Sequence, residues 1–342
     1  MAHEGDTIEI DGGDYPGDVA IWARDRITIR GVNGRPRLIA NGASVEGKAI
    51  WVVRAVDLRM ENIEFVGARV PDRNGAGIRF ERGSLRIKGC VFRDNENGIL
   101  TGGDPDAILE IEDSEFDHNG SGDGYSHNLY VGAIARLVVK GSYFHRANVG
   151  HLLKSRARDS RILYNRLTDE TEGRASYELE FPNGGLAIVI GNVIQQSDRT
   201  ENPVIVAFGR EGYSRAPNEL YLSHNTIVND RKQGGVFILA EPGADVVQTS
   251  NNLLVGPGSV RVPANRISRG DIALPDRTQF VDAKALDLRL KRSSPLRGKA
   301  TPSESADGSS LRPTAEFAGP TGTRPVESTG PLSPGAIQST GT

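Results

Sequence analysis

A short motif that recurs every 23 to 33 residues constrains this chain more than any other feature. In each copy a small or polar residue precedes a pair of mostly apolar residues. The copies begin at Asn62, Cys90, Ser114, Ser142, Asn165, Asn192, Asn225 and Asn252. A unit of this length cannot bury an apolar face alone, so successive units must stack on one another.

Each repeat also contains further strand-like segments, such as Gly77-Ile78-Arg79-Phe80. With 41 glycines and only 6% aromatic residues, the composition suits short strands joined by tight turns. Leucine-rich repeats need a leucine and asparagine consensus that is missing, and propeller blades need about 40 residues or more. The repeats therefore predict an all-β parallel β-helix of about ten coils, stacked about 4.8 Å apart.

Composition excludes several functional classes. The formal net charge is -3, which argues against a basic nucleic-acid-binding protein. The sequence also lacks the apolar run of about 18 residues that would predict a membrane span. Hydrophobic residues make up 37% of the chain, too many for disorder. The single cysteine, Cys90, excludes an intrachain disulfide and a cysteine-based metal site.

Asparagines that begin the motif are expected to form a ladder at one corner, where amides bond the turns of neighbouring coils. The set is Asn62, Asn165, Asn192, Asn225 and Asn252.

Several segments resemble the right-handed parallel β-helix proteins of the pectate-lyase-like superfamily. They include Gly5-Asp6-Thr7-Ile8-Glu9-Ile10, Ser126-His127-Asn128-Leu129-Tyr130-Val131-Gly132 and Gly150-His151-Leu152-Leu153-Lys154-Ser155-Arg156-Ala157. The resemblance covers roughly residues 5 to 260 and implies a single-stranded right-handed parallel β-helix. It implies less about activity, because the superfamily holds lyases, hydrolases, epimerases and inert scaffolds.

The character of the chain changes after the last coil. We expect residues 1–260 to form the β-helix and residues 261–342 to form a last partial coil and an extended segment. Residues 301–342 are rich in Pro, Ser, Thr and Gly, a composition typical of disorder. Their resemblance to the extended ends of this superfamily favours an ordered segment that runs back along the helix.

Alternation along the strands predicts one exposed face that carries polar groups. Leu129, Leu152 and Leu179 each lie 13 residues before a motif and are expected to point inward. Neighbours of opposite parity then point outward. These neighbours are Asn128, Tyr130, His151, Glu178 and Glu180.

Cationic residues extend this predicted site. Lys154 has inward parity but is expected at a strand end, from which it can swing outward, with Arg156 nearby. Arg79 has outward parity two coils earlier, and Glu211 follows the next strand. So many titratable groups on one patch indicate a functional site.

Each residue also has a plain structural interpretation. Glu178 and Glu180 could be the solvated side of a strand, and His151 could bond backbone at a corner. Lys154 and Arg156 could be mere ion-pair partners of the glutamates. We interpret the remaining histidines near the repeats as structural: His118, His127, His145 and His224.

Acidic turns offer oxygen ligands that could bind calcium. They contain Asp94, Asn95, Glu96, Asn97, Asp117, Asn119 and Asp123. Tight turns select the same residue types, and no EF-hand spacing is present, so turn chemistry is the favoured interpretation.

The Lys154-Ser155 pair is similar to the alginate and chondroitin lyase family, in which a lysine abstracts the proton and an arginine assists. Two acidic residues that hold calcium in that family have no counterpart before Lys154, and Glu178 and Glu180 stand where the arginine is expected. The resemblance at the site is therefore partial, and a metal ligand set does not carry over.

Three functions stay open at this point. Lys154 as base, with Arg156 or Arg79 holding a substrate carboxylate, suits a lyase acting on an acidic polysaccharide. Glu178 and Glu180, with Cα atoms about 6.6 Å apart, suit an inverting hydrolase. Asn128, Tyr130 and Arg79 could also hold a glycan without cleaving it. The cations favour the lyase.

A polysaccharide substrate implies a secreted or periplasmic protein. The first residues, MAHEGDTIEIDGG, show no basic and hydrophobic signal pattern, but a signal can be trimmed, so they do not decide export.

Overall fold

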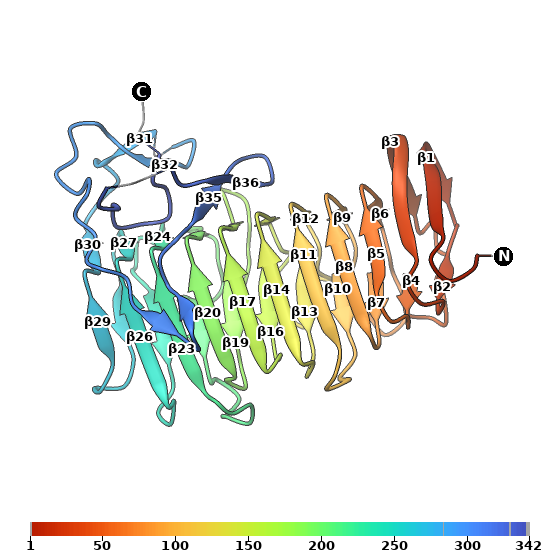
Figure 1. The fold of residues 1–342 in the computed structure, drawn as a ribbon, viewed down its shortest axis with the longest axis horizontal. Helices are drawn as coiled ribbons and strands as arrows, with labels where there is room; N and C mark the ends of the chain where they lie inside the picture. Colours follow the sequence, from red (N-terminus) through yellow and green to blue (C-terminus); the bar gives the residue numbers. More distant parts are fainter. Residues whose placement is uncertain (1, 283, 328–329, 340–342) are drawn as a thin grey trace.

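The computed structural model describes residues 2–282, 284–327 and 330–339. It confirms the predicted class: a right-handed parallel β-helix of about nine turns, close to the ten expected. The coils follow one another from the N-terminal end to the C-terminal end of an elongated molecule (Figure 1). Those residue ranges contain no helix, and so none that could cross a membrane.

Every coil contributes strands to three faces. Face 1 is a ten-stranded sheet of β2 (Ala20–Trp22), β4 (Ala49–Val53), β7 (Ala76–Phe80), β10 (Asn97–Thr101), β13 (Leu129–Val131), β16 (Leu153–Ser155), β19 (Leu179–Phe181), β22 (Val204–Phe208), β25 (Val236–Ala240) and β28 (Ser259–Arg261). Face 2 contains β5 (Leu58–Glu61), β8 (Ser84–Lys88), β11 (Ile108–Glu112), β14 (Arg136–Lys140), β17 (Asp159–Leu163), β20 (Leu186–Ile190), β23 (Glu219–Ser223), β26 (Val246–Ser250) and β29 (Ile267–Arg269).

Face 3 follows face 2 after a tight turn. It contains β6 (Glu64–Val66), β9 (Val91–Arg93), β12 (Glu115–Asp117), β15 (Tyr143–His145), β18 (Arg166–Thr168), β21 (Val193–Gln196), β24 (Thr226–Asn229), β27 (Leu253–Val255) and β30 (Ile272–Leu274). The long strands β1 (Thr7–Pro16) and β3 (Thr28–Ile39) serve faces 2 and 3 together.

Like residues stack on like residues through the core. On face 3, Phe65, Phe92, Phe116 and Phe144 occupy one column, and neighbouring ring centroids lie 4.4 to 5.2 Å apart. All four rings are fully buried. Each ring packs against its neighbours in the column, and a coil shifted by one residue would lose these contacts. The column therefore fixes the register between coils.

The asparagine ladder forms at the turn between faces 2 and 3. The backbone N–H of Asn165 donates to Asn192 Oδ1 at 2.8 Å, and the same contact recurs from Asn192 to Asn225 and from Asn225 to Asn252 at 2.9 Å. Asn62 is not part of this ladder, contrary to expectation. Val91 N–H bonds the Ile63 carbonyl, which places Ile63 rather than Asn62 in the motif position.

The C-terminal segment covers apolar parts of two faces. Ala306 and Leu311 pack against Leu186, Ile188 and Tyr221 of face 2. Its short strand pairs are β31 (Phe280–Asp282) with β32 (Asp287–Leu290), β33 (Ser305–Ala306) with β34 (Ser309–Ser310), and β35 (Ala315–Phe317) with β36 (Thr323–Pro325). The stacked strands themselves continue to Leu274, beyond residue 260.

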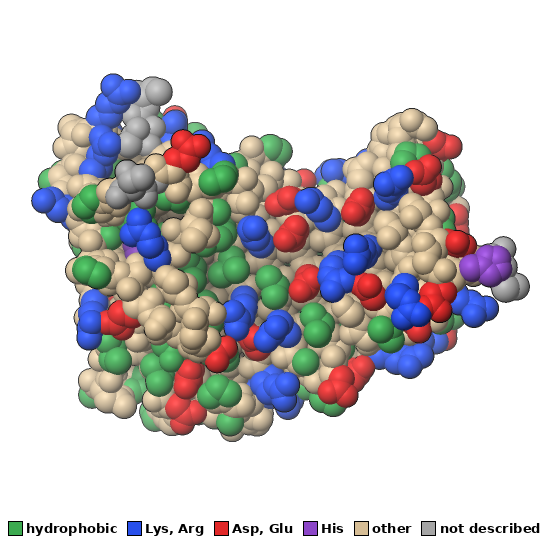
Figure 2. Space-filling model, viewed as in Figure 1, with side chains coloured by type: hydrophobic (Ala, Val, Ile, Leu, Met, Phe, Trp, Pro, Cys, Tyr) green, Lys and Arg blue, Asp and Glu red, His purple; other side chains and the backbone are tan. Residues whose placement is uncertain are grey.

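The N-terminal half of face 2 is charged instead of apolar. Acidic and basic side chains are interspersed there (Figure 2). Arg86 lies between Asp57 and Glu110 and forms ion pairs with both. Ion pairs of this kind join neighbouring strands on this part of the surface.

We expect Leu153→Ala to lower the free energy of unfolding by about 2 to 5 kcal/mol, because Leu153 is fully buried between Leu129 and Leu179. Val56→Ala is the control, since Val56 is 52% exposed and its truncation should change stability by less than about 0.5 kcal/mol. Urea denaturation followed by circular dichroism measures both. Equal effects of the two substitutions would contradict this core assignment.

Candidate functional site on face 1

Two consecutive residues point inward on most strands of face 1. Leu152 and Leu153 are both fully buried, and Leu153, not Leu152, is the register partner of Leu129 and Leu179. The outward residues therefore flank this inward pair and lie three positions apart, at His151 and Lys154. The strict alternation predicted from the sequence is wrong here, and Lys154 faces outward from within β16.

Outward positions on successive strands form two rows. One row contains Tyr130, Lys154 and Glu180 in direct register. The other contains His127, His151 and Tyr177, whose rings contact one another at centroid distances of 4.4 and 4.9 Å. Both rows come from β13, β16 and β19 and the residues just before them.

Ion pairs join the first row to the turns beside it. Lys154 Nζ lies 3.3 Å from Glu180 Oε2 and 3.1 Å from Glu211 Oε1. Arg156 donates to both oxygens of Glu211, at 2.6 and 2.9 Å, and through Nε to the Tyr130 hydroxyl at 3.0 Å. We call this set, together with His151, the face-1 cluster. The structure thus brings together six predicted site residues: Tyr130, His151, Lys154, Arg156, Glu180 and Glu211.

Exposure divides the cluster into a buried base and an open rim. The side chains of Glu180 and Lys154 are 4% and 12% exposed, whereas that of Glu211 is 44% exposed. Hydrogen bonds from Arg156, with the charge of Lys154, lower the pKa of Glu211 to about 2. Glu211 is therefore an ionised carboxylate at the open rim of the cluster.

The buried imidazole of His151 forms a hydrogen bond with Glu180. His151 Nε2 lies 2.8 Å from Glu180 Oε2. Burial lowers the pKa of His151, so the neutral ring donates its Nε2 proton to the carboxylate. Burial also acts to raise the pKa of Glu180, but the His151 hydrogen bond and the charges beside it outweigh this effect and the pKa is lowered.

Two members of the histidine row, His127 and Tyr177, were not predicted as part of the site. His127 was interpreted as structural, yet its Nδ1 accepts the backbone N–H of His151 at 2.9 Å and so positions that residue. Gly150 permits this contact, because a Cβ atom there would collide with the Ser126 carbonyl oxygen. The sequence does contain a signal: His127, His151 and Tyr177 each lie three residues before a row member.

Two predicted site residues point into the core instead. Asn128 is fully buried and extends an internal amide ladder, with Oδ1 accepting from Asn119 Nδ2 at 2.8 Å and Nδ2 donating to the His145 carbonyl at 2.9 Å. Glu178 is also fully buried, and its Oε1 has no hydrogen-bond partner among the described residues. Neither can face a ligand, because both belong to the inward pair.

Arg79 lies on the same face but outside the cluster. It occupies the outward row that continues through Leu100 to Tyr130, three strands from Lys154, or about 14 Å. A polymer lying along the helix axis could reach both residues.

The acidic turns contain internal hydrogen bonds. Asn95 Nδ2 donates to Asn119 Oδ1 at 3.0 Å, and Glu96 Oε2 accepts the backbone N–H of Gly75 at 2.7 Å. Asn95, Glu96, Asn97 and Asn119 are all buried. These oxygens are engaged in shaping turns, and calcium binding by the protein stays a prediction.

Stability should fall as pH rises because of Glu178. Burial raises the pKa of this carboxyl group well above its usual value, helped by Asp169, whose own pKa burial raises to about 7. The folded state thus holds protons that the unfolded chain releases above about pH 4.3. The stabilisation is complete below that pH and is lost as pH rises through the folded-state pKa.

Glu178→Gln should therefore weaken this loss, so that the variant gains stability relative to the parent as pH rises above about 5. Urea midpoints at several pH values measure the effect. Glu112→Gln, at an exposed position on face 2, should leave the pH dependence unchanged. Parallel curves for the parent and Glu178→Gln would contradict the buried, neutral state.

Comparison with known proteins relates this architecture to solved structures. No protein-family model matches the sequence, and no curated protein matches it. The structure is similar to the crystal structure of pectate lyase Pel9A, with a TM-score of 0.53 and 12% sequence identity over 98% of this chain and 88% of that chain. At this identity the likeness concerns the fold. The chain therefore has the pectate-lyase-like, right-handed parallel β-helix fold.

Proposed function

We propose that the protein is a carbohydrate-active enzyme, a lyase that cleaves a uronate-containing polysaccharide at the face-1 cluster by β-elimination. The observation that carries the proposal is the pairing of Lys154 and Arg156 with the exposed carboxylate of Glu211. The two cations already bind one carboxylate at the surface. A uronate carboxylate that displaces Glu211 would find the same geometry.

Arg156 is the residue best placed to orient such a substrate. Its side chain is 19% exposed, and its Nε is held by the Tyr130 hydroxyl. A guanidinium fork binds a carboxylate through two parallel hydrogen bonds. The positive charge also stabilises the enolate that forms when the neighbouring carbon loses its proton.

Lys154 is proposed as the proton-transfer group. Its ammonium can pass a proton to Glu180, 3.3 Å away, and the resulting amine can take the proton next to the substrate carboxylate. The electron pair of that C–H bond forms a carbon–carbon double bond, and the bond to the glycosidic oxygen breaks. The departing oxygen takes a proton from Lys154, which recovers the proton held by Glu180. Cleavage leaves an unsaturated end and a new reducing end.

The hydrolase alternative loses its geometric basis. An inverting hydrolase needs two carboxyl groups that face one groove, and Glu178 lies inside the coil. A binding-only role requires no proton-transfer group beside the cations. The position of Glu180 supports catalysis over binding alone, because its carboxylate lies 3.3 Å from Lys154 Nζ and gives that residue a partner for proton transfer.

Substrate and activity can be tested together on a panel of acidic and neutral polysaccharides. We expect ultraviolet absorbance from unsaturated ends and new reducing ends on an acidic polymer, and binding that weakens as salt rises. Reducing ends without absorbance would show hydrolysis, and binding without either product would show a glycan-binding module. Both outcomes would overturn the proposal.

Lys154→Ala and Glu180→Gln should each lower turnover on the acidic polymer by about 100-fold or more, because they remove proton-transfer groups. Lys88→Ala removes an exposed lysine on face 2 and should leave turnover unchanged. Initial rates of absorbance increase measure all three, with circular dichroism as the check on folding. Full activity of Lys154→Ala would contradict its assigned role.

A further inference from the structure

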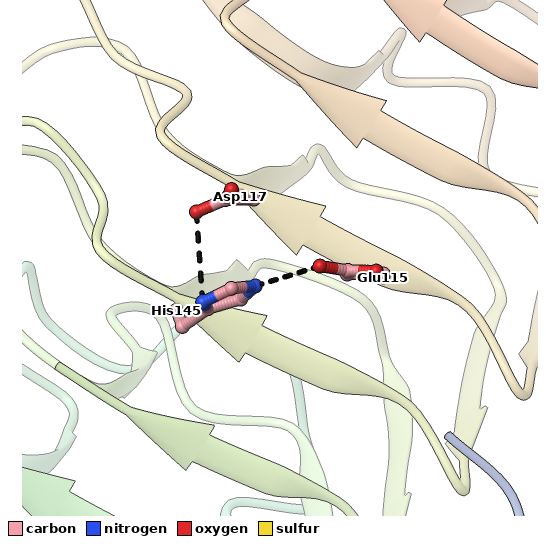
Figure 3. Close-up of side chains that lie close together, drawn as sticks. All are labelled: Glu115, Asp117 and His145. Carbon is pink, nitrogen blue, oxygen red and sulfur yellow. Dashed lines mark hydrogen bonds and ion pairs between the residues drawn. The ribbon is translucent and has the colours of Figure 1, made fainter. Parts of the chain in front are cut away.

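A second group of metal-ligating residues lies on face 3, away from the face-1 cluster. Glu115 and Asp117 extend from β12, and His145 extends from the neighbouring β15 in register with Asp117 (Figure 3). One ligand atom from each residue lies within 4.8 Å of the others. Sequence analysis interpreted His145 as structural and Asp117 as a turn residue.

The two ring nitrogens of His145 have different surroundings. Nε2 lies 3.1 Å from Glu115 Oε1 and is hydrogen-bonded to it. Nδ1 is buried and has no hydrogen-bond partner among the described residues, although Asp117 Oδ1 lies 3.5 Å away and Glu170 Oε1 lies 3.9 Å away. The side chain as a whole is only 4% exposed.

Glu115 selects the tautomer of this ring. When its carboxylate accepts the Nε2 proton, the neutral imidazole presents a bare lone pair at Nδ1. That lone pair points toward two carboxylates in a buried place. Such an arrangement is unfavourable unless a cation lies between them.

The distances suit a small divalent cation. Ligand atoms bound at about 2.0 to 2.2 Å from a metal ion lie about 3 to 3.5 Å from one another. The separation of Nδ1 and Asp117 Oδ1, 3.5 Å, meets this requirement, and Glu170 Oε1 lies slightly farther from Nδ1, at 3.9 Å. A carboxylate bonded to the second nitrogen of a histidine ligand is also a recurrent feature of metal sites.

Arg146 shares Asp117 with this group. Arg146 donates through Nε to Oδ1 and through Nη2 to Oδ2, each at 3.1 Å. His118 Nδ1 also approaches Oδ1, at 2.7 Å. The two oxygens of a carboxylate offer about four lone pairs, so Asp117 can hold the arginine and an ion together when the ion takes the place of His118 on Oδ1. Tyr143 stacks on the imidazole at 4.0 Å and contacts Glu170 through its hydroxyl, which closes the other side.

We propose that His145 Nδ1 and Asp117, with Glu170 at the rim, bind a divalent transition-metal ion such as Zn²⁺, and that Glu115 is a positioning residue that fixes the ring. Imidazole with carboxylates suits Zn²⁺, Co²⁺ or Ni²⁺, whereas Ca²⁺ takes six to eight oxygen ligands. The site is independent of the proposed polysaccharide cleavage, because it lies on another face.

Titration of chelator-treated protein with Co²⁺ alone tests the proposal through the visible absorption of the bound ion. We expect one ion per chain, displaced by Zn²⁺. His145→Gln and Asp117→Asn should each weaken binding at least about 100-fold, and Glu115→Gln, whose amide oxygen still accepts the Nε2 proton, by about 10-fold to 100-fold. His3→Ala removes an exposed histidine far from the site and should change nothing.

Two outcomes would overturn the metal site. Absence of bound Co²⁺ would show that His145 is simply a cation held between Glu115 and Asp117. Binding that survives both His145→Gln and Asp117→Asn would show adventitious binding elsewhere. Circular dichroism identifies a variant that fails to fold. If His145→Gln fails to fold, the nearly isosteric Asp117→Asn tests the site in its place.

Discussion

Direct stacking of each coil on the next is the constraint on which the rest of this structure depends. Phe92 contacts Phe116 at 4.7 Å, and Asn192 bonds Asn225 at the same corner of successive coils. A coil in the N-terminal half cannot slip by one residue without breaking the phenylalanine column, and a coil in the C-terminal half cannot slip without breaking the asparagine ladder. The outward side chains inherit the same register, so Lys154 lies beside Glu180 because Leu153 lies beside Leu179. The chemistry of face 1 is therefore fixed by contacts in the core.

The inward pairs on face 1 explain which predictions from the sequence were right. The repeat spacing predicted the fold, because stacking leaves a periodic signal in residue type. Tyr130, Lys154, Arg156 and Glu211 were predicted beside one another because neighbouring coils must place them there. Leu152 was assigned to the wrong row, since strict alternation does not allow two consecutive inward residues.

The same irregularity explains the two site residues that were wrong. Glu178 and Asn128 have the residue types of a surface, but their positions belong to the inward pair. Asn128 is tolerated there because Asn119 and two carbonyl groups satisfy its amide. The buried carboxyl group of Glu178 has fewer hydrogen bonds to compensate for its burial. The free energy of unfolding therefore depends on whether this group is protonated. Residue type alone could not predict either position, because the irregularity shows only in the paired backbone.

Both charged groups arise from diagonal contacts between neighbouring coils. A carboxylate contacts an imidazole of the adjacent coil on face 1, at Glu180 and His151, and again on face 3, at Glu115 and His145. The difference between them is the cation. Lys154 contacts Glu180 directly and completes the charge balance of that pair. On face 3 the arginine bonds Asp117, and the imidazole Nδ1 still lacks a hydrogen-bond partner among the residues described. On our proposals, the first arrangement exchanges its bound carboxylate for that of a substrate, whereas the second binds an added cation.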